Sequence, residues 1–168
     1  MSEAVVRPGR ESDLPELVAI YNHFVENTHV TFDLEPFAPE ARREWFREFT
    51  ERGPYRLLVA ELGDEVGGYA CSHEFRHKRA YRTSVETSVY VRPAAFGRGL
   101  GRALYRSLFA ALDGDPELHR AYAGVALPNP PSLALHRDFG FREVGTFREV
   151  GFKLDRYWDV CWLERPLG

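Results

Sequence analysis

The chain has 168 residues, of which 44% are hydrophobic and 28% charged, with 22 basic and 25 acidic side chains and a net charge of -3. This length suits a single domain over residues 1–168, and an aromatic content of 14% argues against a disordered chain. Charges interrupt every apolar stretch before the ~20 residues that a membrane span needs, and the first residues lack the apolar core of a secretory signal. The slight negative charge gives no general attraction to nucleic acid or to anionic lipid. We therefore expect a cytoplasmic protein without nucleic-acid or membrane partners.

The cysteine and histidine content narrows the possible cofactors. Cys71 and Cys161 have no close-spaced partner, which argues against a disulfide framework or a thiolate metal site and fits a reducing compartment. His73 and His77 form the one short histidine spacing, but further ligands are missing nearby. We expect no bound metal.

The first predicted elements are a strand over residues 4–7 and a helix that begins at Asp13. Asp13 is a favourable N-cap, and Glu16 stands three residues further on, as in a capping box. Apolar and aromatic residues of this helix recur at spacings of three and four, which predicts one buried face. That face consists of Leu17, Ile20, Tyr21 and Phe24.

A second helix is predicted from about residue 39 to residue 51, with Gly53 placed to end it. The side chains that this helix is expected to bury are Ala41, Trp45 and Phe49. Residues 55–62 and 66–75 are strand-like and flank a Gly63-Asp64 turn, so they predict a hairpin.

The rest of the chain alternates between strands and helices. Further strands are expected over residues 82–91, 121–127, 141–150 and 157–164. A helix over residues 99–112 presents a stripe of leucines at every fourth position. A shorter helix covers residues 130–139, with Asn129 as N-cap and Gly140 at its end. This order predicts a mixed α/β layer fold, with helices on both faces of one largely antiparallel sheet.

A glycine-rich turn joins the strand over residues 82–91 to the leucine-striped helix. Gly97, Gly99 and Gly101 allow the backbone to approach a ligand, and the following helix start offers free N–H groups and a positive dipole end. Such a site suits a phosphate or pyrophosphate. A dinucleotide fingerprint is excluded because Arg102 and Leu104 stand where a third glycine would be needed, and no Gly-Lys-Ser/Thr follows as in a P-loop. The alternative is a glycine-rich turn that binds no ligand.

This turn resembles the acyl-CoA pyrophosphate loop of the GNAT N-acetyltransferases. The family pattern, Gln/Arg-x-x-Gly-x-Gly/Ala, is read here as Phe96-Gly97-Arg98-Gly99-Leu100-Gly101. Phe96 departs from the usual Gln or Arg, which leaves the backbone cradle intact but removes a possible side-chain donor. A second family signature is matched by Asn129, Ser132, His136, Gly140 and Phe141.

The resemblance extends to one subfamily, the phosphinothricin and methionine sulfoximine N-acetyltransferases and related L-amino acid N-acyltransferases. Its characteristic stretches appear in order over nearly the whole chain: residues 20–28 (IYNHFVENT), 31–36 (TFDLEP), 83–91 (TSVETSVYV) and 145–160. Departures include Asn-Pro-Pro at residues 129–131, Arg-His-Lys at residues 76–78, and Thr87 in place of a frequent histidine. The resemblance implies the GNAT fold, acetyl-CoA as co-substrate, a homodimer, and direct acetyl transfer in a ternary complex. The implied acceptor is the free amino group of a small amino acid or analogue.

Glu86 is the candidate general base. Transfer from a thioester to an amine needs a deprotonated amine, and Glu86 is the only acidic residue between residues 76 and 112. Strand alternation puts it on one face with Ser88 and Tyr90, where burial would raise its pKa toward neutrality. The family resemblance implies the same role. The alternative is a solvent-facing glutamate on an amphipathic strand.

His136 is the second catalytic candidate. It stands seven residues after Asn129, where many GNAT enzymes place a tyrosine that protonates the departing thiolate. A histidine that titrates near neutrality suits either this step or removal of the amine proton. The alternative is a helix histidine that only packs beside Leu133 and Leu135.

The expected cofactor contacts are mostly made by backbone. The strand segment Val89, Tyr90 and Val91 is expected to pair with the extended pantetheine arm, as an added strand pairs with a sheet edge. The pyrophosphate is expected on the amides of Gly97, Arg98, Gly99, Leu100, Gly101 and Arg102. Asn129 either contacts the pantetheine or only caps its helix, and Tyr105 is expected in the core.

The acceptor site is expected beside Glu86. Arg76, His77 and Lys78 form a basic cluster suited to the carboxylate or phosphinate of an amino-acid-like substrate, although such a run is also typical of a solvated surface. Phe32 resembles the aromatic pocket wall of the family. Thr87 and Ser88 are expected to donate further hydrogen bonds.

Two other functions compete with this interpretation. Acetylation of a protein N-terminus or a polyamine predicts an open acidic groove, which the basic cluster disfavours. A non-catalytic acyl-CoA sensor is disfavoured by the presence of both Glu86 and His136. The aromatic tail is expected either to form a subunit contact or to pack in the core, and it comprises Phe152, Tyr157, Trp158 and Trp162.

Overall fold

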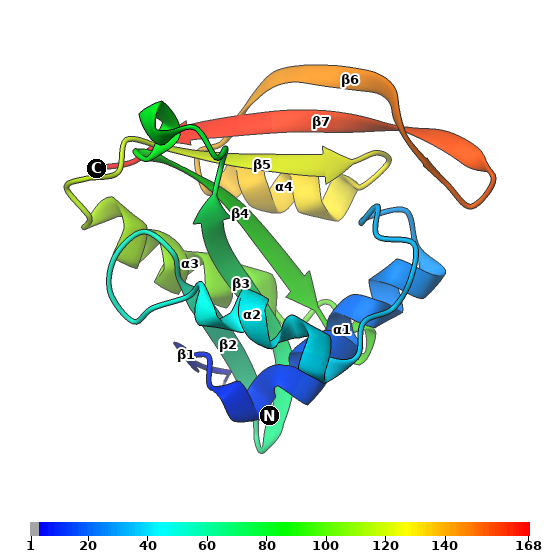
Figure 1. Ribbon diagram of the computed structural model, residues 1–168, viewed down its shortest axis with the longest axis horizontal. Helices are drawn as coiled ribbons and strands as arrows, with labels where there is room; N and C mark the ends of the chain where they lie inside the picture. Colours follow the sequence, from blue (N-terminus) through cyan, green and yellow to red (C-terminus); the bar gives the residue numbers. More distant parts are fainter. Residues whose placement is uncertain (1–3) are drawn as a thin grey trace.

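The computed structural model describes residues 4–168, in which seven strands form one sheet covered by helices on both faces (Figure 1). The strands are β1 (Val5–Pro8), β2 (Leu57–Leu62), β3 (Glu65–Glu74), β4 (Ser84–Val91), β5 (Arg120–Ala126), β6 (Arg142–Lys153) and β7 (Arg156–Pro166). The helices are α1 (Leu14–Asn27), α2 (Arg43–Arg47), α3 (Leu100–Asp113) and α4 (Pro130–Asp138). Across the sheet the order is β1-β2-β3-β4-β5-β7-β6, and among the strands of residues 4–168 only β4 and β5 run parallel. The predicted mixed α/β fold with a largely antiparallel sheet is confirmed.

The predicted capping box at the start of α1 is wrong. A 3-10 turn over Glu11–Asp13 precedes the helix, and Asp13 makes no side-chain cap on α1. The Asp13 carboxylate instead accepts a hydrogen bond from the backbone amide of Arg10 at 2.7 Å and two from the Arg7 guanidinium at 2.8 Å. Charge-assisted hydrogen bonds of this kind are stronger than a neutral helix cap, so the buried Asp13 carboxylate bonds to Arg7 instead of capping α1. Glu16 pairs with Arg92 instead.

The second helix is shorter than predicted. A 3-10 turn over Pro39–Arg42 leads into α2, which ends at Arg47. Ala41 is exposed rather than buried, whereas Trp45 and Phe49 are half-buried against the α1 side of the sheet. A helix of one and a half turns is not stable alone, and aromatic packing at Trp45 holds this one in place.

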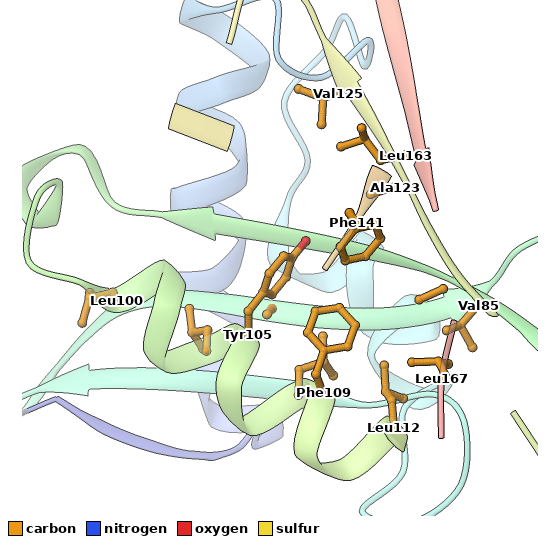
Figure 2. Close-up of a cluster of buried hydrophobic side chains, with 14 of the residues drawn as sticks. Val85, Leu100, Tyr105, Phe109, Leu112, Ala123, Val125, Phe141, Leu163 and Leu167 are labelled. Atoms are coloured by element: carbon orange, nitrogen blue, oxygen red, sulfur yellow. The ribbon is translucent and has the colours of Figure 1, made fainter. Parts of the chain in front are cut away.

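The hydrophobic core is divided by the sheet into two clusters. On one face, α3 packs its leucine stripe against the strands, and all four leucines are at most 1% exposed: Leu100, Leu104, Leu108 and Leu112. Figure 2 shows this cluster together with Phe109, Phe141 and Tyr105. On the other face, α1 buries Leu17, Ile20 and Phe24 against β2 and β3. The helical spacings predicted both buried faces.

The parallel pair β4 and β5 stays together only briefly. Their pairing covers three residue pairs, from Ser84 with Arg120 to Glu86 with Tyr122. Beyond Glu86 the two strands diverge, and their arrowheads point apart in Figure 1. On its other side β4 remains paired with β3, which comes so close at Gly68 that a Cβ there would lie 2.7 Å from the carbonyl oxygen of Tyr90. The sheet is therefore split at its centre.

The last two strands extend further than predicted. β6 and β7 form a long hairpin whose pairing is irregular between Phe147 and Gly151, where Glu149 adopts a positive φ of 51°. The Glu149 amide donates to Asp159 at 2.7 Å, and Arg148 also bonds this carboxylate. None of the helices within residues 4–168 is long and apolar enough to span a membrane.

We predict that Arg7→Met destabilises the fold by about 3 kcal/mol at pH 7, because it leaves the buried Asp13 carboxylate without its charged partner. Burial alone would raise the pKa of Asp13, but the hydrogen bonds from Arg7 and from the Arg10 amide outweigh it and lower the pKa. This pair therefore stabilises the fold above the ordinary aspartate pKa, and its contribution is lost as the pH falls. Urea unfolding at pH 7 and pH 3 measures the effect.

Arg47→Met is the matched control, since Arg47 forms an exposed pair with Glu44. Equal destabilisation by both substitutions, or an Arg7→Met effect independent of pH, would contradict the assignment.

Candidate active site

A cleft of about 820 Å³ occupies the space where β4 and β5 part. Its walls come from β4, β5, the glycine-rich turn with the start of α3, α4, and the end of α1. Its volume lies within the range of about 300–1,000 Å³ that is typical of small-molecule and cofactor sites. A cleft at a split between strands exposes backbone groups as well as side chains.

The glycine-rich turn forms one end of the cleft. Gly97 and Gly99 have positive φ values of 76° and 79°, a conformation that glycine adopts without strain. The helix bonds begin with the Ala103 amide, which donates to the Gly99 carbonyl at 3.1 Å. The amides at the start of α3 precede this bond and have no helical acceptor. Amides and dipole together make this end of the cleft a site for an anion.

Most residues predicted for the pyrophosphate site line the cleft: Gly97, Gly99, Leu100, Gly101 and Arg102. Arg98 does not, and its amide bonds to the Ala95 carbonyl at 3.4 Å. Phe96 is 59% exposed at the cleft, so the position that departs from the family pattern presents an aromatic ring there.

The β4 segment from Thr87 to Val91 forms the long wall of the cleft. β5 no longer pairs with β4 beyond Glu86, so this edge of β4 faces the cleft. The side chains alternate: Tyr90 contacts Tyr21 and Tyr69 on the α1 side, while Val89 packs in the α3 cluster. An edge of this kind can pair with an extended ligand, as a sheet edge pairs with an added strand.

Glu86 lies at the corner where the two strands separate. It is the last residue of β4 that pairs with β5, and its side chain is 24% exposed. Burial raises the pKa of this carboxyl, while His73 and Arg76 oppose the rise. The Arg76 guanidinium lies 3.9 Å from a carboxylate oxygen of Glu86. A carboxyl with a raised pKa can accept a proton near neutral pH.

His136 is buried in the wall formed by α4. Its Nδ1 lies 2.8 Å from the Ser132 carbonyl oxygen, so Nδ1 carries the hydrogen that is donated there. Its Nε2 lies 2.9 Å from the Tyr105 hydroxyl and therefore accepts from it. Burial lowers the pKa of His136, which favours the neutral ring with this tautomer.

Tyr105 is a site residue that the sequence analysis placed in the core. Its ring is fully buried on α3, yet its hydroxyl reaches His136 and borders the cleft, and Figure 2 shows it pointing away from the helix axis. Burial raises the pKa of the phenol. The sequence did contain a signal for this role: a tyrosine beside the leucine stripe is expected to be buried, and a buried hydroxyl needs a hydrogen-bond partner.

Asn129 also borders the cleft, and its side-chain oxygen accepts from the Ser132 amide at 3.2 Å. The predicted N-cap is therefore present. The carboxamide is held at the start of α4, about two turns before His136.

The predicted acceptor residues are spread along the cleft and its mouth. Thr87 and Ser88 line it. From the basic cluster, Arg76 alone reaches Glu86, and its guanidinium lies 4.2 Å from the Phe75 ring centroid. His77 is exposed and bonds to the Glu74 carboxylate at 2.7 Å, and Lys78 is exposed.

Phe32 lies outside the lining of the cleft. Its ring packs directly on Gly151 of β6, where no room remains for a Cβ atom. The ring thus joins the loop after α1 to the β6–β7 hairpin. Within residues 4–168, no three His, Cys, Asp or Glu side chains lie close enough together to hold a metal ion.

Comparison with known proteins places this geometry in a family. Residues 17–141 match the model of the acetyltransferase (GNAT) family. The chain belongs to the GNAT family of acetyltransferases. It is 58% identical to phosphinothricin N-acetyltransferase of Streptomyces coelicolor, over 99% of this chain and 98% of that protein.

Two further similar proteins are also named as acetyltransferases. One is an L-methionine sulfoximine/L-methionine sulfone acetyltransferase of Pseudomonas aeruginosa, 34% identical over 98% of this chain and 95% of that protein. The other is the crystal structure of a GNAT phosphinothricin acetyltransferase from Sinorhizobium meliloti in complex with acetyl-CoA. It superposes with a TM-score of 0.90 at 34% identity and covers 98% of this chain and 89% of that chain. The predicted GNAT fold is confirmed.

Proposed function

We propose that this chain is an acetyl-CoA-dependent N-acetyltransferase that acetylates the free amino group of a small amino acid or analogue, such as phosphinothricin or methionine sulfoximine. One observation carries the proposal: a single cleft runs from an anion-binding helix start to Thr87 and Ser88, the two residues that directly follow Glu86 at the point where β4 and β5 separate. The names of the relatives support both the reaction and the class of acceptor.

The groups that line the cleft are suited to binding coenzyme A. The diphosphate would bind the amides between Gly97 and Arg102, and the pantetheine arm would run along the open edge of Val89 to Val91. Acetyl-CoA supplies the activated acetyl group as co-substrate. A similar structure that contains acetyl-CoA supports the choice of this co-substrate.

Glu86 would remove the proton that an amino group carries at neutral pH, directly or through one water. Burial keeps its pKa above the ordinary glutamate range, so the carboxylate is a stronger base than an exposed one. The freed amine then attacks the thioester directly while both substrates are bound. Holding both reactants in place can supply on the order of 7–11 kcal/mol of the barrier reduction, and a general base adds about 10²–10⁴ in rate.

His136 would act together with Tyr105. At rest the histidine is neutral, and both of its ring nitrogens are engaged. Both side chains line the cleft, and because Nε2 carries no proton in this tautomer, the Tyr105 hydroxyl that donates to it is the group with a proton to give. This pair is therefore our candidate for protonating the departing thiolate.

Arg76 would bind the carboxylate of the acceptor. Half of its side chain is exposed, and it lies between Glu86 and the rings of Phe75 and Trp162. A guanidinium held on aromatic rings is suited to bidentate carboxylate recognition. In this proposal His77 and Lys78 form the outer rim, Thr87 and Ser88 line the inner site, and Phe32 supports the wall from the α1 loop.

Thiol release from acetyl-CoA, followed against a panel of acceptors, tests the proposal. Release with phosphinothricin, methionine sulfoximine or L-amino acids supports it. Release only with peptides or polyamines would replace it by protein N-terminal or polyamine acetylation. Coenzyme binding without release by any acceptor would replace it by a non-catalytic sensor.

We predict that Glu86→Gln lowers kcat/KM at least about tenfold at neutral pH, because the amide cannot accept a proton. The decrease should shrink as the pH rises and the amine loses its proton without help. Binding of coenzyme A, measured by calorimetry, should stay unchanged. Glu74→Gln, one strand away and exposed, is the control that should retain full activity. Full activity of Glu86→Gln would remove this residue from the mechanism.

We predict that Gly99→Ala weakens coenzyme A binding, because the positive φ of Gly99 shapes the amide cradle and a Cβ costs roughly 1–2 kcal/mol in that conformation. Gly114→Ala, at the other end of α3 with a φ of -84°, should bind normally. Calorimetric titration with coenzyme A compares the two. Equal affinities would argue against the cradle.

We further propose a homodimer in the cytoplasm. β6 is an edge strand, and the β6–β7 hairpin exposes six large apolar side chains: Val144, Phe147, Val150, Phe152, Leu154 and Tyr157. An exposed apolar hairpin of this kind is typical of a subunit contact. Trp158 and Trp162 pack internally, on His29 and near Phe75. The free, buried Cys71 and Cys161 support a reducing compartment.

We predict that Phe152→Glu shifts the protein from dimer to monomer, because a charge would be buried at the subunit contact. Light scattering after gel filtration at micromolar concentration measures the mass. Leu34→Glu, at an exposed apolar residue outside the hairpin, should leave the dimer intact. A monomeric wild-type protein, or a dimeric Phe152→Glu variant, would contradict this contact.

A further inference from the structure

His73 lies on the strand next to Glu86, directly opposite this proposed base in the β3–β4 pair. The register of β3 and β4 pairs His73 with Glu86, so both side chains project from the same face of the sheet. Residues opposite each other in an antiparallel pair have Cβ atoms about 4.5–5.5 Å apart. The His73 ring is half-buried, and its Nδ1 lies 3.3 Å from the Glu74 carbonyl oxygen.

The other groups that face Glu86 come from each neighbouring element. Arg76 approaches from the loop after β3, Tyr122 stands in register on β5, and Cys71 is the next residue along β3 on the same face. Beyond Tyr122 on β7, the carboxylate of Glu164 pairs with Arg120 and Arg142. On the α2 side, burial has the largest effect on the pKa of Cys71, and the charges of Arg42 and Glu48 also influence it.

Two cations therefore oppose the effect of burial on Glu86, and they differ in kind. Arg76 is charged at every pH of interest, whereas a histidine changes its charge between about pH 5 and pH 8. In the proposed function Arg76 also binds the acceptor carboxylate, which neutralises part of its charge. His73 is then the cation beside Glu86 that the acceptor leaves free.

We propose that His73 is a positioning residue for Glu86, whose charge across the β3–β4 pair sets the pH range in which Glu86 acts as the base. The inference rests on the proposed function. Protonated His73 holds Glu86 ionised at low pH. Without a positive charge at residue 73, only Arg76 opposes the effect of burial, and Glu86 becomes a stronger base.

A charge series at residue 73 tests the inference. His73→Gln removes the charge, His73→Arg makes it permanent, and His119→Gln, at an exposed histidine away from Glu86, is the control. The acidic limb of kcat/KM against pH should move to higher pH in His73→Gln and to lower pH in His73→Arg. At the lowest pH at which both variants remain folded, kcat/KM should be roughly threefold or more higher in His73→Arg. The wild type should follow the Arg variant at low pH and the Gln variant at high pH.

A second readout does not depend on turnover. Carbon-13 NMR of labelled glutamate side chains, with Glu86→Gln as the assignment control, should show the Glu86 titration moving in opposite directions in the two variants. Shifts in the same direction, or no shift in either, would overturn the inference even if Glu86→Gln remains impaired. An unimpaired Glu86→Gln would instead overturn the proposed base, and the NMR titration would then judge the His73 effect alone.

Discussion

The short pairing between β4 and β5 is the constraint on which the cleft depends. Three residue pairs hold the two strands together, and beyond Glu86 the sheet opens. Two parallel strands that separate leave backbone groups without partners, which normally costs stability. The loss is confined here because β4 stays paired with β3, and β5 stays paired with β7, along most of their lengths. The halves of the sheet are thus held rigid on each side of the opening.

Burial then gives the groups around this opening their chemical properties. It raises the pKa of Glu86 and lowers the pKa of His136, so both groups are pushed toward their neutral forms. The two neutral forms differ in what they offer: the histidine has a fixed tautomer bonded to Tyr105, whereas the carboxyl is poised to exchange a proton. Separating two titratable groups by environment is a common way to assign acid and base roles on one protein.

Local patterns in the sequence predicted much of the fold. The leucine stripe of α3 and the turn glycines at residues 97 and 99 depend on neighbours within one or two turns of chain, so their spacing was informative. Asp13 looked like a helix cap because its local pattern fits one, but a partner on β1 outweighed the local signal. Likewise, α2 is shorter than its apolar spacing indicated.

The site was predictable only where it is built from consecutive residues. Glu86 and the glycine-rich turn lie in one continuous segment, and the family resemblance named them. The contact between Tyr105 and His136 joins residues 31 positions apart, and the separation of β4 from β5 is a property of the whole sheet. No short pattern encodes either of them. The basic run at residues 76–78 looked uniform in sequence, yet chain direction brings only its first member to Glu86.

The alternation of side chains along β4 has a consequence for how such a protein can diverge. One face of this strand carries Glu86, Ser88 and Tyr90, and the other carries Thr87 and Val89. In the proposed complex, the pantetheine pairs with the backbone at the open edge of β4, whereas the side chains on the face of Glu86 and Ser88 are available to the acceptor. Substitution of Ser88 would therefore retune the choice of nucleophile, while the backbone edge of Val89 to Val91 keeps its grip on the acyl donor. New acceptor preferences can thus arise without rebuilding the donor side.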